Sequence, residues 1–135
     1  MANITPEDIR ADHAEAVRLR LFGADKLEDA EYAAGVCNGV GPEWMPDVMR
    51  KLIDLLNPVM VLPSRIHDVE YAIGGTEADR QVADTLFHSN VLFVIEDRYA
   101  WYNPMRYIMV NRAGRFYEYL RIFGKKAYHY KEAKA

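Results

Sequence analysis

A histidine, an aspartate and a tyrosine lie close together near the middle of the chain, in the pattern His67-Asp68-x-x-Tyr71. Side chains four residues apart share one face of a helix, so His67 and Tyr71 are expected to point the same way. Asp68 is about 100° further round the helix and is expected to face a different neighbour. A histidine and a carboxylate placed in this way can serve proton transfer and cation binding at one cleft.

A glycine-punctuated segment precedes this pattern and reads Cys37-Asn38-Gly39-Val40-Gly41-Pro42. Two glycines let a backbone curl until its carbonyl oxygens converge, which Cβ atoms would obstruct. Carbonyl oxygens and one carboxylate are hard oxygen ligands, which Ca²⁺ takes in sets of about six to eight. Together with Asp68, the segment could therefore supply oxygen ligands of the kind that Ca²⁺ takes.

A third pattern, Ala78-Asp79-Arg80, falls in the first turn of a predicted helix. The spacing Thr76-x-x-Asp79 is also typical of a capping box, in which each residue bonds the backbone N–H of the other. An acidic residue in a first turn is favoured by the helix dipole as well.

These residues need helices to position them, and apolar spacing with capping signals predicts five. The predicted ranges are about 6–22, 46–56, 65–73, 77–101 and 104–123, with Thr5-Pro6, Thr76 and Asn103-Pro104 marking three of the starts. Residues 24–46 contain Gly35, Gly39, Gly41, Pro42 and Pro46 and are expected to form the main irregular region of the chain. No alternating strand pattern persists, so we expect an all-α single domain over residues 1–124 and a fraying Lys-rich tail over 125–135.

Length and charge exclude some kinds of protein. The chain has 135 residues, which is the size of one domain. Its net charge of -3 argues against a nucleic-acid binder that works by bulk charge. No uncharged stretch is long enough to cross a bilayer as a helix, which needs roughly 20 apolar residues. With one cysteine, Cys37, and no secretory signal visible at the start, we expect a cytoplasmic protein as synthesised, virion-associated or exported by a non-classical route.

Taken together, the three patterns resemble the phospholipase A2 superfamily, in particular its disulfide-poor branch associated with phages and bacteria. The resemblance covers roughly residues 35–90, in the order calcium loop, His-Asp helix, second long helix. It implies a phospholipase A2-like fold with two antiparallel core helices, which carry the His-Asp pair and a partner Asp, and extra helices at both ends. It also implies a hydrolase for lipid degradation, which cleaves a phospholipid acyl ester and depends on calcium.

The resemblance assigns catalytic roles to individual residues. His67 would be the general base that takes a proton from the attacking water. Asp79 would hydrogen-bond the far nitrogen of His67 and favour the imidazolium that forms, and Tyr71 would support the same carboxylate. Capping by Asp79 and this catalytic support are not exclusive, so both interpretations stay open.

The resemblance likewise assigns the calcium ligands. Asp68 would bind Ca²⁺ through both carboxylate oxygens, and the backbone carbonyls of Cys37, Gly39 and Gly41 would supply three more ligand atoms. The Gly39 N–H, with Ca²⁺, would stabilise the developing oxyanion.

The expected partner is the surface of a phospholipid membrane, bound without insertion of a helix across it. Several aromatic residues and one methionine suit either core packing or a rim that rests on lipid. They are Trp44, Met45, Tyr99, Trp101 and Tyr102. The alternative to an enzyme is a non-enzymatic structural or accessory protein of phage origin that keeps a phospholipase A2-like fold.

Overall fold

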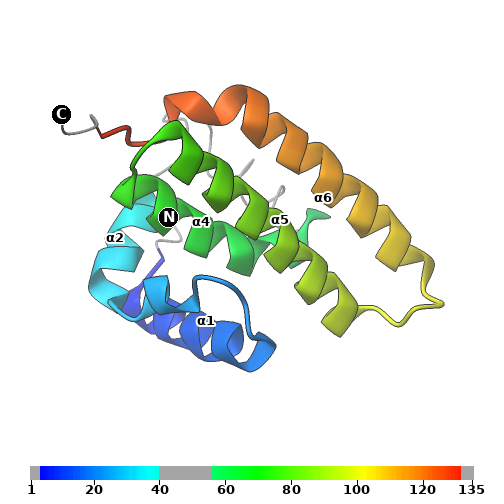
Figure 1. Ribbon diagram of the computed structural model, residues 1–135. Coiled ribbons are helices and arrows are strands. Elements are labelled where there is room, and N and C mark those ends of the chain that lie inside the picture. Colours follow the sequence, from blue (N-terminus) through cyan, green and yellow to red (C-terminus); the bar gives the residue numbers. More distant parts are fainter. Residues whose placement is uncertain (1–3, 40–55, 132–135) are drawn as a thin grey trace.

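The computed structural model describes residues 4–39 and 56–131, and those residues are almost entirely helical (Figure 1). The helices are α1 (Pro6–Leu19), α2 (Ala30–Gly39), α4 (Val61–Ile73), α5 (Glu77–Arg98) and α6 (Pro104–Phe123). The described residues also contain three short 3₁₀ turns: η1 (Ala24–Leu27) between α1 and α2, η2 (Pro58–Met60) before α4, and η3 (Gly124–Lys126) after α6. Within the described ranges the only β pairing is an isolated bridge between Gly75 and Tyr130. The predicted all-α class is confirmed.

The capping residues set three helix starts as predicted. Thr5 and Asp8 form a capping box at α1, where the Thr5 hydroxyl accepts from the Asp8 N–H at 3.2 Å. The Asn103 side chain accepts from the N–H of Met105 at 2.9 Å and begins α6. α1 ends before the predicted residue because Arg20 adopts the left-handed conformation, with φ 57°.

Other boundaries differ from the prediction. α4 begins at Val61, four residues before the predicted start, and α5 ends at Arg98 rather than near residue 101. The predicted helix at 46–56 lies outside the described residues except for Leu56.

Residues 24–39 are helical rather than irregular, which corrects the prediction for that part of the chain. Ala30, Ala33, Ala34 and Cys37 recur at helical spacing and are all buried against α1 and α4. Gly35 lies on the exposed side, where a Cβ would meet nothing within 4 Å. A glycine there weakens a helix by roughly 1 kcal/mol without ending it, because burial of the opposite face outweighs that cost.

The end of the chain packs against the domain as far as Lys131, so the prediction that it frays from Gly124 is wrong for the described residues. The N–H of His129 donates to the carbonyl of Tyr71 at 3.1 Å, and the N–H of Lys131 donates to the carbonyl of Gly75 at 2.9 Å. Tyr128 is buried, with its ring edge against Tyr71 at a centroid distance of 5.0 Å.

α4 lies between two parts of the core. Ile66 and Val69 pack on the side of α1 and α2, while His67 and Tyr71 face α5. α4 and α5 run antiparallel, and His67 and Tyr71 on α4 hydrogen-bond Asp84 on α5 (Figure 1). α5 and α6 form the next antiparallel pair, and Arg121 on α6 bonds the same Asp84. A second apolar cluster, built around Phe87 on α5, fills the space under α6. Among the described helices, none is long and apolar enough to cross a membrane.

Candidate active site

His67 and Tyr71 lie on the face of α4 that points at α5, as their spacing predicts. Both side chains are buried, His67 being 6% exposed and Tyr71 3%. Their rings are 4.1 Å apart between centroids, and the ring of Phe87 also lies against His67, at 5.1 Å. The aromatic neighbours therefore fix the plane of the imidazole.

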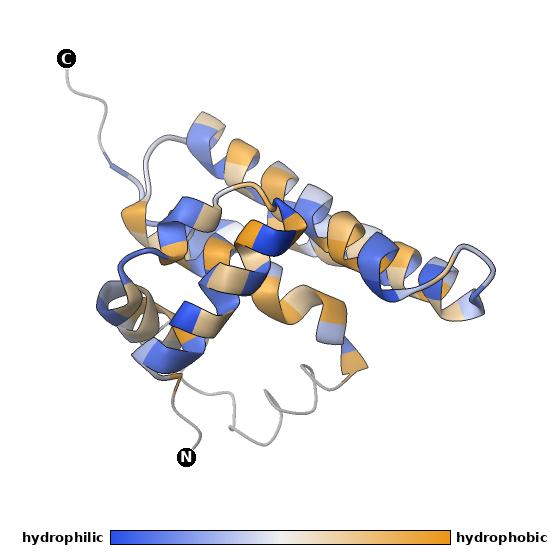
Figure 2. Cartoon of the chain, turned by 90° about the horizontal axis from the view of Figure 1, so that it is seen from below, coloured by the Kyte–Doolittle hydropathy of each residue, from blue (hydrophilic) through white to orange (hydrophobic). Residues whose placement is uncertain are grey.

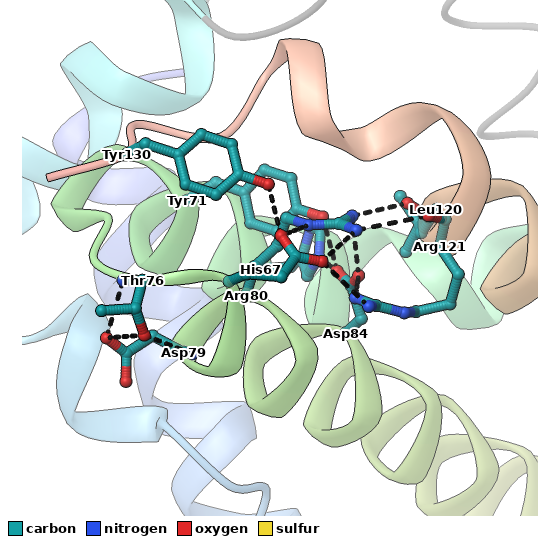
Figure 3. Close-up of polar contacts among 10 residues, drawn as sticks. His67, Tyr71, Thr76, Asp79, Arg80, Asp84, Leu120, Arg121 and Tyr130 are labelled. Carbon is teal, nitrogen blue, oxygen red and sulfur yellow. Dashed lines mark hydrogen bonds and ion pairs between the residues drawn. The ribbon is translucent and has the colours of Figure 1, made fainter. Parts of the chain in front are cut away.

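Asp84 on α5 is the carboxylate that faces His67. Its Oδ1 lies 2.8 Å from Nε2 of His67 and accepts the hydroxyl of Tyr71 at 2.6 Å (Figure 3). Its Oδ2 accepts Nη1 of Arg121 at 2.7 Å and Nη1 of Arg80 at 3.3 Å. One fully buried carboxylate thus connects α4, α5 and α6.

The hydrogen bonds around Asp84 keep it ionised although it is fully buried. Burial by itself raises the pKa of this carboxyl, but hydrogen bonds from His67, Tyr71 and Arg121 outweigh burial and leave the pKa below its ordinary value. The pKa of Tyr71 is raised, first by burial and then by its bond to the Asp84 carboxylate. Tyr71 therefore stays a hydroxyl that donates.

Arg80 supports this carboxylate from the core. Its side chain is 0% exposed and donates to Glu77 at 2.8 and 2.7 Å and to the carbonyl of Leu120 at 3.0 Å. Arg121 also reaches Glu77, at 3.1 Å. The guanidinium groups of Arg80 and Arg121 thus face the carboxylates of Glu77 and Asp84, so the net charge of the cluster is zero when His67 is neutral. Each buried charge therefore has a partner of opposite sign.

The structure contradicts the role predicted for Asp79. Its carboxylate turns back on its own helix start, where it accepts the N–H of Thr76 at 2.9 Å, while the Thr76 hydroxyl accepts the N–H of Asp79 at 3.2 Å (Figure 3). Asp79 therefore caps α5, and the predicted hydrogen bond to His67 is made by Asp84 instead. The physical reason is position: a residue in the first turn has free backbone donors beside it.

A signal for Asp84 was present in the sequence. Ala83, Phe87, Val91 and Ile95 repeat at intervals of four and are all buried, so they mark the inner face of α5. Asp84 follows Ala83 and precedes Phe87 by three residues, which places it on that face.

Asp68 lies on α4 next to His67 but faces a different neighbour, as its helical position predicts. It is half-buried. Its charge adds to the rise in the pKa of the Cys37 thiol, which burial raises to about 12. Asp68 is therefore on the side of α4 that faces α2, near Cys37, the first residue of the segment predicted as a calcium loop.

The predicted calcium loop is helical over its first three residues. Cys37 is buried in the last turns of α2, its thiol 3.7 Å from the carbonyl of Arg65, and α2 continues to Gly39. Carbonyls of a helix point along its axis in parallel and do not curl toward one point, although those of the last turn, which includes Cys37 and Gly39, have no partner within the helix. The N–H of a helical residue is engaged by the carbonyl four residues before it. The loop geometry expected of Cys37 and Gly39, and the oxyanion role of the Gly39 N–H, are therefore not supported; Gly41 lies outside the described residues.

No group of three or more His, Cys, Asp and Glu side chains in the described ranges is arranged to hold a metal ion. The side-chain ligand predicted for calcium is the Asp68 carboxylate, and the other predicted ligands are backbone carbonyls, of which that of Gly41 lies outside the described residues.

A hollow of about 330 Å³ lies near the α4–α5 turn, and neither His67 nor Asp84 lines it. It is lined by Lys26, Glu70, Ile73, Gly74, Asp79, Val82, Ala83 and Tyr128. Burial raises the pKa of Glu70 to about 7, with Lys26 opposing the rise. The hollow and the His67 cluster are separate features of the same two helices.

Comparison of the chain with protein-family models, with curated proteins and with solved structures finds no match.

Proposed function

We propose that this chain is a phospholipase A2-like carboxylic ester hydrolase that cleaves an acyl ester of a phospholipid. The observation that carries the proposal is the buried His67, whose Nε2 lies 2.8 Å from an ionised Asp84. This pairing of a histidine with a carboxylate from the next antiparallel helix supports the role that the sequence resemblance assigns to His67, with Asp84 in place of Asp79.

The geometry favours proton transfer at the other ring nitrogen. With its proton on Nε2, His67 donates to Asp84 and presents a lone pair at Nδ1, which is bonded to none of the described residues. Nδ1 would take a proton from a water as the water oxygen bonds to the ester carbonyl carbon. The imidazolium that forms is balanced by Asp84, and it returns the proton to the leaving alkoxide as the ester C–O bond breaks.

Tyr71 and the two arginines act on the carboxylate and not on substrate. Tyr71 holds Oδ1 of Asp84 in place beside His67, while Arg80 and Arg121 hold Oδ2. We infer that they are positioning residues, because a carboxylate fixed at both oxygens cannot rotate away from the imidazole.

Calcium dependence is part of the proposal, with Asp68 as the carboxylate that would contact the ion. Bound Ca²⁺ would supply positive charge to polarise the ester carbonyl. A chelator measures this component separately from the role of His67.

The alternative is a non-enzymatic structural or accessory protein. One observation favours it: the cluster around Asp84 joins three helices and balances its own charges, which is sufficient reason for a core to keep these residues. In that case His67 is a buried partner of Asp84 and carries out no reaction.

Hydrolysis of a fluorogenic phospholipid in vesicles distinguishes the two. We expect turnover with millimolar Ca²⁺, loss of turnover with a chelator, and a fall of about 10²-fold or more for His67→Gln. His88→Gln is the matched control, because His88 also lies against an aromatic ring, that of Tyr117 at 5.2 Å, but has no part in the Asp84 cluster.

Equal loss of activity in both variants would point to general destabilisation and contradict the assignment of His67. No turnover by the wild type at any calcium concentration would support the non-enzymatic alternative. Turnover that a chelator leaves unchanged would keep His67 as the base and remove calcium from the proposal.

A further inference from the structure

The outer face of α6 carries a continuous row of exposed residues that we call the α6 stripe. Their spacing alternates between three and four, which places them on one face of the helix. The α6 stripe consists of Met105, Ile108, Arg112, Arg115, Tyr119 and Ile122, all exposed. Phe123 extends it at its end, with its ring 4.9 Å from that of Tyr119.

Hydrophobic exposure is concentrated in this part of the molecule. Seventeen large hydrophobic side chains are exposed among the described residues, and nine of them lie between Trp101 and Phe123. Ile122 is 66% exposed and Tyr119 55%, whereas Met109, Ala113 and Leu120 on the opposite side of α6 are buried. Figure 2 shows the hydrophobic and hydrophilic residues alternating along the two long helices. A gathering of this kind indicates an interaction surface rather than scattered exposure.

The charge of the same region is opposite to that of the whole chain. Residues 98–126 contain seven arginines and lysines and a single acidic residue, Glu118, although the chain has a net charge of -3. Two of the seven, Arg106 and Arg121, are paired with carboxylates of α5, and the other five form no salt bridge with an acidic side chain among the described residues. Arg112 and Arg115 lie within the stripe itself; Arg112 donates to the carbonyl of Leu56 at 2.8 Å and is still exposed. The partner of this surface is therefore expected to be anionic.

A second copy of the chain does not suit the α6 stripe. Arg112 and Arg115 lie at its middle, so two stripes packed antiparallel about a two-fold axis would bring four guanidinium groups together with no acidic residue in the stripe to balance them. Nucleic acid would satisfy the arginines but would leave Met105, Ile108 and Ile122 without an apolar partner.

We propose that the α6 stripe binds the surface of a membrane that contains anionic phospholipid. The arginines would contact lipid phosphates, while the aliphatic and aromatic side chains enter the boundary between headgroups and acyl chains. Trp101 and Tyr102, 74% and 72% exposed at the turn before α6, have the amphipathic rings that favour this boundary. That the partner is a phospholipid membrane rests on the proposed function. The α6 stripe adds that the protein would bind anionic membranes in preference to zwitterionic ones.

Sedimentation with vesicles tests the surface without any measurement of turnover. The vesicles contain phosphatidylcholine alone, or phosphatidylcholine partly replaced by phosphatidylserine, and the wild type and His67→Gln are both used. We expect binding to the anionic vesicles only, equal for the two proteins, and weakened by salt. Because His67 takes no part in this surface, loss of hydrolysis and loss of binding are separate results.

Two pairs of variants locate the binding. The double variant Arg112→Gln, Arg115→Gln is expected to weaken vesicle binding about 25-fold, roughly fivefold for each arginine near an anionic surface. The control Arg10→Gln, Arg20→Gln removes the same charge from exposed positions in and just after α1 and should change vesicle binding little.

For the apolar contribution, Ile122→Ser is expected to weaken binding at least about threefold. Val17→Ser, at a residue 55% exposed on α1, serves as the control and should have no effect.

Equal binding to both kinds of vesicle, or equal effects of the stripe variants and their controls, would overturn the proposal. So would a concentration-dependent dimer that the stripe variants abolish, or tight binding of single-stranded DNA in place of vesicles. Circular dichroism checks that each variant keeps its helices.

Discussion

Two aspartates on α5, five residues apart, allow the central feature of the site to be tested by matched variants. Asp84→Asn removes the negative charge that pairs with Arg80 and Arg121, while Asp79→Asn changes only the cap of α5. Both substitutions keep the size of the side chain and a carbonyl oxygen. A difference between them therefore reports the surroundings of each carboxylate.

The expected magnitudes follow from burial. Asp84 and the Arg80 side chain are 0% exposed, and removing one member of a buried ion pair costs about 3–5 kcal/mol. Arg80 and Arg121 keep Glu77 as a partner, so we expect a loss near the lower end of that range. Asp79 lies at the exposed start of its helix, where a weakened cap costs about 0.5–1 kcal/mol. A domain of this size has an unfolding free energy of roughly 5–15 kcal/mol, so Asp84→Asn is expected to remain folded with a large loss.

Urea denaturation followed by far-UV circular dichroism measures both free energies of unfolding. The pH dependence gives a second test, because the pKa of Asp84 in the folded protein lies below its ordinary value of 3.8. The folded state then binds fewer protons than the unfolded state, so the contribution of Asp84 is complete above that value and is lost as pH falls through the lower, folded pKa. The difference between the wild type and Asp84→Asn should accordingly shrink in acid.

Equal losses for Asp84→Asn and Asp79→Asn at neutral pH would refute this reasoning. So would a difference between the wild type and Asp84→Asn that does not change down to about pH 2. Either result would mean that an ionised Asp84 does not stabilise the fold by pairing with Arg80 and Arg121.

Three further predictions concern other parts of the molecule. Gly124→Ala is expected to destabilise the fold by about 1–3 kcal/mol, because its Cβ would lie 2.5 Å from the Tyr71 hydroxyl. Gly114→Ala, whose Cβ would meet nothing within 4 Å, should stabilise α6 by about 0.5–1 kcal/mol. Urea denaturation measures both free energies of unfolding, and changes of the opposite sign would contradict the packing. Burial raises the pKa of Glu70 to about 7, so its protonated form stabilises the fold below its ordinary pKa and that contribution is lost as pH rises from 4.5 to about 7. Glu70→Gln should therefore raise the Tm relative to the wild type at about pH 8 and leave it similar at about pH 4, and equal shifts at both pH values would exclude this titration. Burial raises the pKa of the Cys37 thiol to about 12, so iodoacetamide should modify it slowly in the native protein and rapidly in urea, and rapid native labelling would show that the thiol is accessible.

Local sequence signals determined the parts of the fold that depend on neighbouring residues. Thr5, Thr76 and Asn103 begin their helices as predicted, because a capping side chain and the backbone donors it satisfies are within three residues of each other. The spacing of His67 and Tyr71 also placed them on one face, since a helix fixes that relation whatever packs against it.

Only the tertiary structure decided which carboxylate meets His67. Asp79 and Asp84 lie on the same helix, and both are chemically able to accept from an imidazole. The rotation of α5 about its axis is set by the burial of Ala83 and Phe87, and that rotation turns Asp84 toward α4. Asp79 stays at the helix start, where the nearest unsatisfied donor belongs to Thr76.

The same distinction explains the other corrections. Glycines near residues 35–41 indicated a loop, but a buried alanine face holds α2 as a helix to Gly39. The Lys-rich end looked free, yet Tyr128 fills a space between Tyr71 and Ala83 that neither helix closes alone. Burial of a face and pairing across distant segments depend on residues far apart in the chain, and these long-range contacts exist only once the helices have packed.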